Sequence, residues 1–363
     1  MVTSEKCQTR KWHYVDLLVR IWQIDLNIKG SRTVDQNYRI SGVHTRIPAV
    51  PHELTDRITP VEKSIVLCHL GVPDIETDQW RLTIDGMVER PAVLTFGQLK
   101  QFPFCELQSF HQCAGSPLNP HQPTRRICNV IWGGARLKDV LANSRVLPGA
   151  TFLWSSGYDG GVLADTVCPT YMKDLPIDRI GQDVLIAYEM NGKPLLPEHG
   201  YPARLVVPGY YGTNSVKWLR RLELSSTRAS GPFTTKWYND PLYGADGTPT
   251  GETQPVWAVA PQSIIVCPAP AATITAGRTY EIWGWAWADE GVDQVVLSTD
   301  GLSWFETVVE KQAERGWQRF SMDWAAPHRG KFSIMSRARS CGGIVQPLAQ
   351  RRNAIFSIEI EAI

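Results

Sequence analysis

The chain changes character at a Pro- and Gly-rich stretch, residues 238–261. After this stretch, short runs of apolar, β-branched and aromatic residues recur at close intervals. These runs are residues 280–286, 292–298, 317–324, 331–338 and 354–360. Such spacing is typical of a β-sandwich, because each run can lay one apolar face on a shared core. We therefore predict a separate all-β domain over residues 246–363.

The region before this stretch mixes strand and helix patterns. Strands are expected at residues 80–86, 107–111, 151–155 and 204–207. Helices are expected at residues 14–26, 96–102, 137–143 and 171–175. This mixture predicts an α+β domain over residues 46–245, preceded by an N-terminal arm over residues 1–45.

Composition sets broad limits on function. Hydrophobic residues make up 43% of the 363 residues, charged residues 20%, and the formal net charge is +1. These values describe an ordinary globular protein and do not indicate nucleic-acid binding. The longest apolar runs are well short of the roughly 20 residues that a membrane span needs, so no span is expected. The N-terminus has no pattern of a secretory signal, which makes the cytoplasm the expected location, or the periplasm if a signal has been removed.

The eight cysteines show no C-x-x-C spacing and do not suggest a disulfide framework. A single cysteine is most simply a small buried hydrophobe. Cys113 differs in its setting, because it follows an apolar strand pattern and precedes Ala114-Gly115, where backbone can approach a ligand closely. From these residues alone its thiol could be a nucleophile, a ligand of a soft metal, or neither.

A second block of motifs gives Cys113 a context. The sequence AYEMNGKPL at residues 187–195 is followed by HGYPARLVVPG at residues 199–209 and SVKWL at residues 215–219. With Cys-Ala-Gly at Cys113 and WGGARL at residues 132–137, these motifs resemble the sulfite oxidase family in sequence and in order. The resemblance covers residues from about 59 to 224, and more weakly the C-terminal region. It implies a molybdopterin-binding domain followed by an immunoglobulin-like dimerisation domain.

The resemblance also implies a cofactor and the residues that bind it. Cys113 is similar to the family cysteine whose thiolate ligates molybdenum, in a cofactor of molybdenum and molybdopterin. A soft sulfur donor suits this metal. Tyr238 matches the family's active-site tyrosine, beside the oxygen ligands of the metal. The positions that match cofactor-binding residues are Cys68, His69, Asp159, His199, Arg204, Ser215, Val216 and Lys217.

The substrate region departs from the family pattern. Arginines follow the cysteine in the family's sulfite oxidases, but this chain has Ser116-Pro117-Leu118, and Leu67-Cys68 stands where the family has an Arg-Asn pair. Each lost charge-assisted hydrogen bond would weaken the binding of an oxyanion by about 1.5 to 3 kcal/mol. Other cations lie in segments that could border the pocket. They are His121, Arg125, Arg126, Lys236, Arg351 and Arg352.

These observations predict an oxidoreductase that transfers an oxygen atom to or from a small oxyanion or sulfur-containing substrate, with sulfite or a related sulfur compound as the default. Reduction of an S-oxide, an N-oxide or nitrate is an alternative. A cofactor-binding relative with little turnover is another. The sequence has no pattern of a haem domain, so we expect a separate electron acceptor such as a cytochrome. The family resemblance implies a homodimer.

Overall fold

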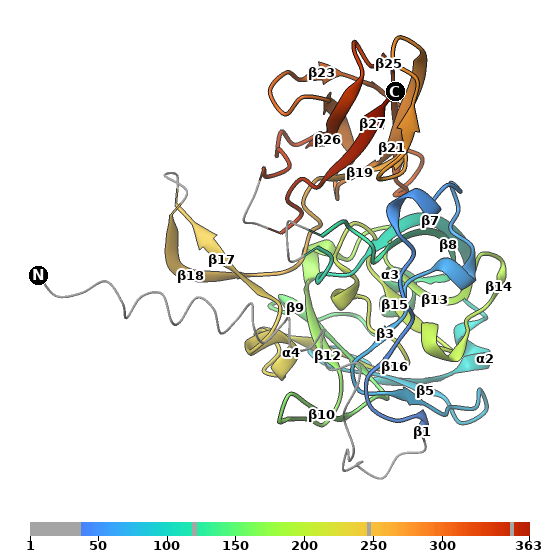
Figure 1. Ribbon diagram of the computed structural model, residues 1–363. Coiled ribbons are helices and arrows are strands. Elements are labelled where there is room, and N and C mark those ends of the chain that lie inside the picture. The colour runs from blue at the N-terminus through green and yellow to red at the C-terminus, as the bar shows by residue number, and fades with distance from the viewer. Residues whose placement is uncertain (1–37, 118–121, 245–247, 349–351) are drawn as a thin grey trace, which may run out of the picture.

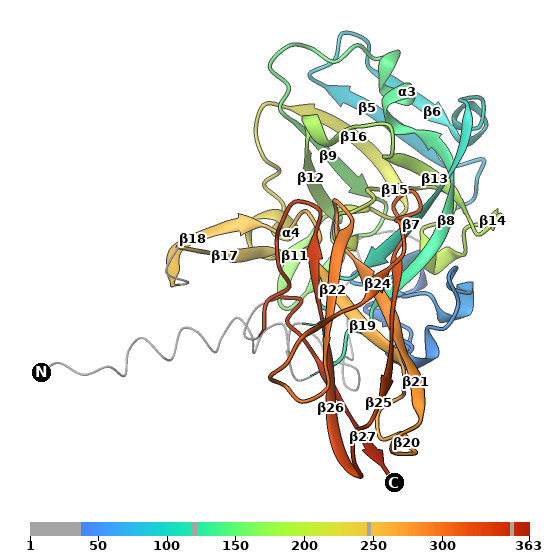
Figure 2. The ribbon, with the colours of Figure 1, turned by 90° about the horizontal axis from the view of Figure 1, so that it is seen from above.

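The structure is a computed structural model that describes residues 38–117, 122–244, 248–348 and 352–363. The described chain is built mainly from strands, with three short α-helices (Figure 1). The C-terminal strands form a separate body that lies against the larger N-terminal body (Figures 1 and 2). The helix predicted at residues 14–26 lies outside the described residues, as does most of the predicted arm. Within the described residues, no helix is long and apolar enough to cross a membrane.

Two five-stranded sheets carry the N-terminal body. The first has the order β12 (Met172–Pro176), β9 (Phe152–Gly157), β16 (Leu219–Ser225), β5 (Arg81–Gly86) and β6 (Ala92–Thr95). The second has the order β14 (Lys193–Pro194), β13 (Leu185–Met190), β8 (Ile127–Arg136) and β7 (Phe104–Gln112), with β15 (Arg204–Val206) also paired to β13. Alternate side chains of these strands, such as Leu82 and Ile84, enter one apolar core.

Four shorter strand pairs complete this part of the chain. They are β1 (Tyr38–Ile40) with β4 (Val72–Pro73), β2 (His44–Thr45) with β3 (Leu67–Cys68), β10 (Gly161–Leu163) with β11 (Thr166–Cys168), and β17 (Asn239–Tyr243) with β18 (Pro249–Pro255). The β17–β18 hairpin projects away from the larger body (Figure 1). The pairing of β2 with β3 places Cys68 opposite His44 and orients the turn that carries His69.

The helices are α2 (Phe96–Leu99), α3 (Leu137–Ala142) and α4 (Pro232–Thr235). Helix α2 begins at a capping box, in which Thr95 and Gln98 each accept a hydrogen bond from the other's backbone N–H. The helices predicted at residues 96–102 and 137–143 are therefore present in shortened form. The prediction of a helix at residues 171–175 is wrong. This segment is mostly β12, because its backbone completes the edge of the sheet beside β9.

The C-terminal body is a sandwich of two sheets. One has the order β19 (Gln262–Cys267), β21 (Thr279–Trp287), β25 (Gln318–Ala325) and β24 (Val308–Val309). The other has the order β20 (Thr273–Ile274), β27 (Ser357–Ala362), β26 (Gly330–Ser340), β22 (Val292–Ser298) and β23 (Phe305–Glu306). Apolar side chains from both sheets share one core, including Ile282, Phe320, Ile334 and Ile360. The predicted strands fall on β21, β22, β25, β26 and β27, which confirms the expected all-β region.

The two bodies share an apolar core. Phe110 of β7 lies in this cluster with the sandwich residues Trp285, Trp287 and Trp317. The rings of Trp285 and Trp317 stack with their centroids 4.7 Å apart. The indole N–H of Trp317 also donates to the backbone oxygen of Arg57 at 2.9 Å. The sandwich is thus packed against the N-terminal body by both apolar and hydrogen-bonded contacts.

A buried amide cluster lies beside this core. The side-chain nitrogen of Gln112 is 2.6 Å from the Ser116 oxygen, 2.7 Å from the side-chain oxygen of Gln262 and 3.0 Å from that of Asn353. Its own side-chain oxygen accepts from the indole of Trp287 at 2.9 Å. Gln112 and Asn353 are fully buried. The cluster therefore ties the residue before Cys113 to the sandwich.

We predict that Trp317→Ala lowers the free energy of unfolding by about 3 to 5 kcal/mol, because it leaves a cavity between the two bodies and removes a stacked ring. Urea unfolding monitored by far-UV circular dichroism measures this loss. Trp324→Ala, at a half-buried position of the sandwich away from the shared core, is the control and should cost less. A cost below about 1 kcal/mol for Trp317→Ala would contradict the prediction.

Candidate cofactor site

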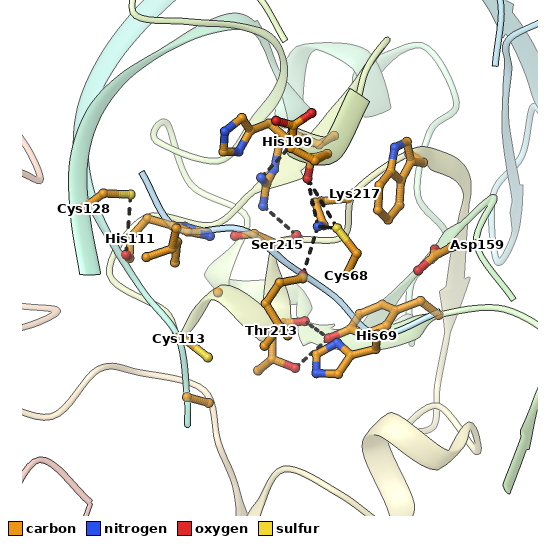
Figure 3. Close-up of a pocket in the computed structure, with 18 of the residues that line it drawn as sticks. Cys68, His69, His111, Cys113, Cys128, Asp159, His199, Thr213, Ser215 and Lys217 are labelled. Carbon is orange, nitrogen blue, oxygen red and sulfur yellow. Dashed lines mark hydrogen bonds between the residues drawn. The ribbon is translucent and has the colours of Figure 1, made fainter. Parts of the chain in front are cut away.

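One cavity gathers almost every residue that the sequence singles out. It holds about 770 Å³ of space, including the part open to solvent. Its lining includes Cys68, His69, Cys113, Asp159, His199, Arg204, Ser215, Lys217 and Tyr238. Figure 3 labels seven of these side chains around one space, with His199 and Lys217 on one side and Cys113 and His69 on another. Val216 does not line the cavity, since its side chain lies in the apolar core.

The side chains come from segments far apart in the chain. Cys68 ends β3, and Cys113 directly follows β7. Arg204 begins β15. Lys217 lies in the segment that leads into β16. The sheets bring these strand ends together, as expected when ligand-binding groups lie on loops held by a rigid scaffold.

Arg204 forms the deepest positive charge of the cavity, with 4% of its surface exposed. Its guanidinium donates to the backbone oxygens of His199 and Ser215, each at 3.0 Å. Its plane lies over the Trp132 ring, 4.9 Å from the centroid. Burial lowers the pKa of Arg204 to about 10, which leaves it charged at neutral pH. Among the described residues, no carboxylate lies within 4 Å of this charge.

Lys217 adds a second cation to the same side of the cavity. Its ammonium donates to the backbone oxygens of Leu67 and Glu198, each at 3.0 Å, and to the sulfur of Cys68 at 2.9 Å. Within the described part of the chain, its hydrogen-bond partners are these two carbonyl oxygens and the thiol, and the side chain of Glu198 pairs with Arg46 instead. Neither cation forms an ion pair with a carboxylate of the described residues, so this side of the cavity is suited to an anion such as a phosphate.

The histidines of the cavity are neutral. Burial, reinforced by the charge of Lys217, lowers the pKa of His69 to about 3 and the pKa of His199 to about 3. The buried Nε2 atom of His199 has no hydrogen-bond partner within the described structure. Each ring therefore offers one donor and one acceptor rather than a charge.

Asp159 presents an unpaired oxygen to the cavity. Its side chain is 3% exposed, and its Oδ1 atom has no hydrogen-bond partner among the described residues. Burial raises the pKa of this carboxyl to about 7, against the lowering effect of Lys217. A buried acceptor without a donor is costly unless a ligand completes it. The Oδ1 atom of Asp159 and the Nε2 atom of His199 can therefore form hydrogen bonds with a polar ligand that carries both N–H and acceptor groups.

The opposite side of the cavity holds the thiol of Cys113. This side chain is half-buried, and its sulfur accepts a hydrogen bond from the backbone N–H of Gly115 at 3.4 Å. The backbone N–H of Cys113 donates to the Arg126 oxygen at 2.9 Å, which extends the pairing of β7 with β8 beyond the strand ends. The hydroxyl of Tyr238 lies 3.0 Å from the Nε2 atom of His69. A thiol, a phenol and a neutral imidazole therefore line one region.

Sequence reasoning missed several residues of the cavity. His111 lies two residues before Cys113 on β7, and a strand period of two puts both side chains on one face. This two-residue spacing could have identified His111 from the sequence. Tyr171 and Thr213 also line the cavity, and the Tyr171 hydroxyl lies 2.7 Å from that of Thr213. No pattern in the sequence marks these two, because they meet only through the tertiary fold.

The candidate substitutes for the missing arginines lie in different places. Arg125 donates to the backbone oxygen of Pro48, and Lys236 donates to the hydroxyl of Thr166. The charge of Arg126 acts on His69, so Arg126 is close to the cavity. Arg352 forms an ion pair with Asp240. Leu118, His121 and Arg351 lie outside the described residues.

Comparison with known proteins supports a cofactor-binding oxidoreductase. Residues 69–233 match the family described as the oxidoreductase molybdopterin binding domain. The chain is 32% identical to chicken (Gallus gallus) sulfite oxidase over 67% of this chain and 57% of that protein. It is 29% identical to a nitrate reductase [NADH] of Brassica napus over 75% of this chain and 34% of that protein.

The fold comparison agrees. The structure of the sulfane dehydrogenase SoxCD from Paracoccus pantotrophus matches with a TM-score of 0.74 at 27% identity, over 92% of this chain and 90% of that chain. The fold and the cavity thus define a molybdopterin-binding oxidoreductase. The chain belongs to the sulfite oxidase family. It spans less than three-fifths of the length of the sulfite oxidases that it matches, 57% of the chicken enzyme and 59% of the rat enzyme.

The cofactor of this family, molybdenum bound to molybdopterin, fits the cavity. The two cations suit the phosphate of the cofactor, and the orphaned atoms of Asp159 and His199 suit its N–H and acceptor groups. Cys113 supplies a soft sulfur donor at the other side. The residues that would hold each part are therefore present in one space.

We predict that Asp159 makes the cofactor-free protein less stable as the pH rises. An Asp titrates near pH 4 in the unfolded chain, and burial raises the pKa of Asp159 to about 7 in the folded protein. Its contribution to stability is therefore fully present below about pH 4 and is lost as the pH rises through about 7. The test compares the free energy of unfolding of the wild type with that of Asp159→Asn. The wild-type value minus the mutant value should fall by up to about 4 kcal/mol between about pH 4 and about pH 7.

Urea unfolding of protein produced without the cofactor, at several pH values, measures this difference. Asp165→Asn changes an exposed carboxylate of the same region and is the control. If the difference between wild type and Asp159→Asn is the same at pH 4 and pH 7.5, the prediction is wrong.

Proposed function

We propose that this protein transfers an oxygen atom between water and a sulfur-containing substrate at a molybdopterin centre ligated by Cys113. One observation carries the proposal. A single cavity is lined by the half-buried thiol of Cys113, by Tyr238 hydrogen-bonded to His69, and by two cations that no carboxylate of the described residues pairs with. When bound, the cofactor supplies a metal that accepts and returns electron pairs and an oxygen atom. The chain positions that cofactor and the substrate.

Each group of cavity residues has a role that follows from its chemistry. Arg204 and Lys217 bind the phosphate, and Asp159, His199 and Ser215 accept or donate hydrogen bonds to the pterin. The thiol of Cys68 contacts Lys217, and His69 contacts Tyr238 on the side of Cys113. Cys113 would hold the metal, and the phenol of Tyr238 would donate a hydrogen bond to the substrate. The hydrogen bond between Tyr238 and His69 orients this phenol.

The substrate side favours a sulfur atom that carries little negative charge. Leu67 and Pro117 stand where family arginines would surround an oxyanion, and Leu67 lines the cavity. Arg126 leaves some positive charge near His69. A sulfane sulfur or another sulfur compound of low charge therefore suits this side better than doubly charged sulfite. The likeness to a sulfane dehydrogenase over most of the chain supports the same choice.

The proposal also assigns a role to the C-terminal sandwich and a class of electron acceptor. We infer that the C-terminal sandwich is the immunoglobulin-like domain of the family and supports a homodimer. Electrons would leave to a separate acceptor such as a cytochrome. A cytoplasmic location, or a periplasmic one after removal of a signal, also stays a prediction.

The metal assignment predicts a specific outcome for Cys113→Ser. The wild type should contain about one molybdenum and one pterin per chain by elemental and fluorescence analysis. Cys113→Ser should keep the pterin, because Arg204 and Lys217 are intact, and should lose at least about 100-fold in turnover with ferricyanide as acceptor. Cys105→Ser changes a half-buried thiol that does not line the cavity, and it should behave like the wild type. Wild-type protein that takes up neither molybdenum nor pterin would contradict the proposed function.

The substrate assignment predicts a gain of function. Leu67→Arg should raise kcat/KM for sulfite by about 10-fold or more, because it adds one charge-assisted hydrogen bond to the oxyanion. The gain should shrink at high salt. Leu67→Gln adds polarity without charge and is the control. Steady-state assays with sulfite, a sulfane-sulfur compound and methionine sulfoxide as alternative substrates test the choice, and a wild type that prefers sulfite as strongly as Leu67→Arg would refute it.

A further inference from the structure

Lys173 is a buried cation without a carboxylate partner. It lies in β12, and only 1% of its surface is exposed. Its ammonium donates to the backbone oxygen of Phe233 at 3.0 Å. Within the described chain, no carboxylate lies within 4 Å of this ammonium, because the neighbouring Asp174 pairs with Arg228. Lysines are almost never fully buried unless they are paired, so this one requires an explanation.

The aromatic ring that Lys173 faces belongs to Tyr238. The ammonium lies 5.5 Å from the centroid of this ring, within the range of a cation–π contact. The Phe233 ring lies nearly parallel to the Tyr238 ring, with the centroids 6.4 Å apart. Phe233 also packs against Tyr171, with centroids 4.2 Å apart. Lys173 thus contacts both the start of α4, through the Phe233 oxygen, and the tyrosine that follows α4.

The backbone of Tyr238 is strained. Its φ angle is +59°, a left-handed conformation that is uncommon for a bulky residue. Such a conformation persists only where the surroundings impose it. The Tyr238 oxygen accepts a hydrogen bond from the N–H of Val256 at 3.0 Å, and its hydroxyl meets His69 at 3.0 Å. Lys173 contacts the ring itself, together with Phe233.

We propose that Lys173 is a positioning residue for Tyr238, which fixes the ring and stabilises the negative charge that develops on the phenol oxygen during oxygen transfer. This inference rests on the proposed function of Tyr238. The buried ammonium acts without touching the substrate, because Tyr238 lines the cavity and Lys173, behind its ring, does not. The ammonium therefore adds positive charge behind the Tyr238 ring, close to a substrate side that lacks the family arginines.

The pKa of Lys173 is consistent with this role. Burial lowers this pKa to about 8, while Asp174 raises it and Arg228 lowers it. Most of the lysine is therefore cationic at neutral pH. A positive charge held in the core at a cost to stability is expected where function requires it.

The experiment compares Lys173→Met with the wild type as complete, cofactor-loaded enzymes. Methionine keeps the length and apolar contacts of the side chain but removes the charge. We expect equal or higher resistance to urea, an unchanged molybdenum content, and a kcat for sulfite, with ferricyanide as acceptor, that is at least about 10-fold lower, with KM changed less than about threefold. Lys173→Arg, which restores a cation, should recover part of the kcat.

A double-mutant cycle separates positioning from general structure. In a Tyr238→Phe background, Lys173→Met should reduce kcat no further, because the phenol on which it acts is gone. Lys100→Met is the control, since Lys100 lies over the rings of Phe96 and Tyr188, away from the cavity, and should not change kcat.

Two results would overturn the inference. The first is a Lys173→Met enzyme that holds molybdenum and turns over like the wild type. The second is a loss of kcat that is the same with and without the Tyr238 hydroxyl. A wild type that takes up no molybdenum would instead overturn the proposed function on which the inference rests.

Discussion

The pairing of β7 with β8 is the interaction on which the site depends. The two strands are in register over nine residue pairs, from Phe104 opposite Ala135 to Gln112 opposite Ile127. The pairing continues into the bond between Cys113 and Arg126, so the thiol is held at the end of a rigid ladder. Gln112 then attaches the same strand end to the sandwich through its buried amide. The C-terminal domain thus helps to fix the position of a residue that belongs to the N-terminal domain.

Burial of positive charge explains the character of the cavity. Arg204 and Lys217 are satisfied by backbone oxygens and a thiol rather than by carboxylates. Their positive charge stays available to an anionic ligand, and the same charge helps to keep His69 and His199 neutral. Lys173, behind the Tyr238 ring, is likewise a buried cation that donates to a backbone oxygen and not to a carboxylate. Without a ligand, these groups reduce stability, and binding of a polar anionic cofactor reverses part of that cost.

The sequence predicted the fold best where local pattern and tertiary role agree. The sandwich strands and α3 were predictable, because each has an apolar face with the period of its structure. The segment 171–175 was predicted wrongly, since its short pattern suits a helix but its backbone completes the edge of a sheet. His111 was predictable from its spacing to Cys113. Tyr171 and Thr213 were not, because their contact joins segments about forty residues apart.

By itself, the sequence determined the two-part architecture, the family and nearly all of the residues expected at the cofactor. These follow from periodicity and from motifs that are local in the chain. The tertiary structure alone decided which charges are neutralised and which remain available. Arg352 is paired with Asp240 and Lys236 contacts Thr166, whereas Arg204, Lys217 and Lys173 are held without carboxylates. The physical reason is that the effect of a charge depends on its burial and on its partners, and both are set by contacts between residues that are distant in sequence.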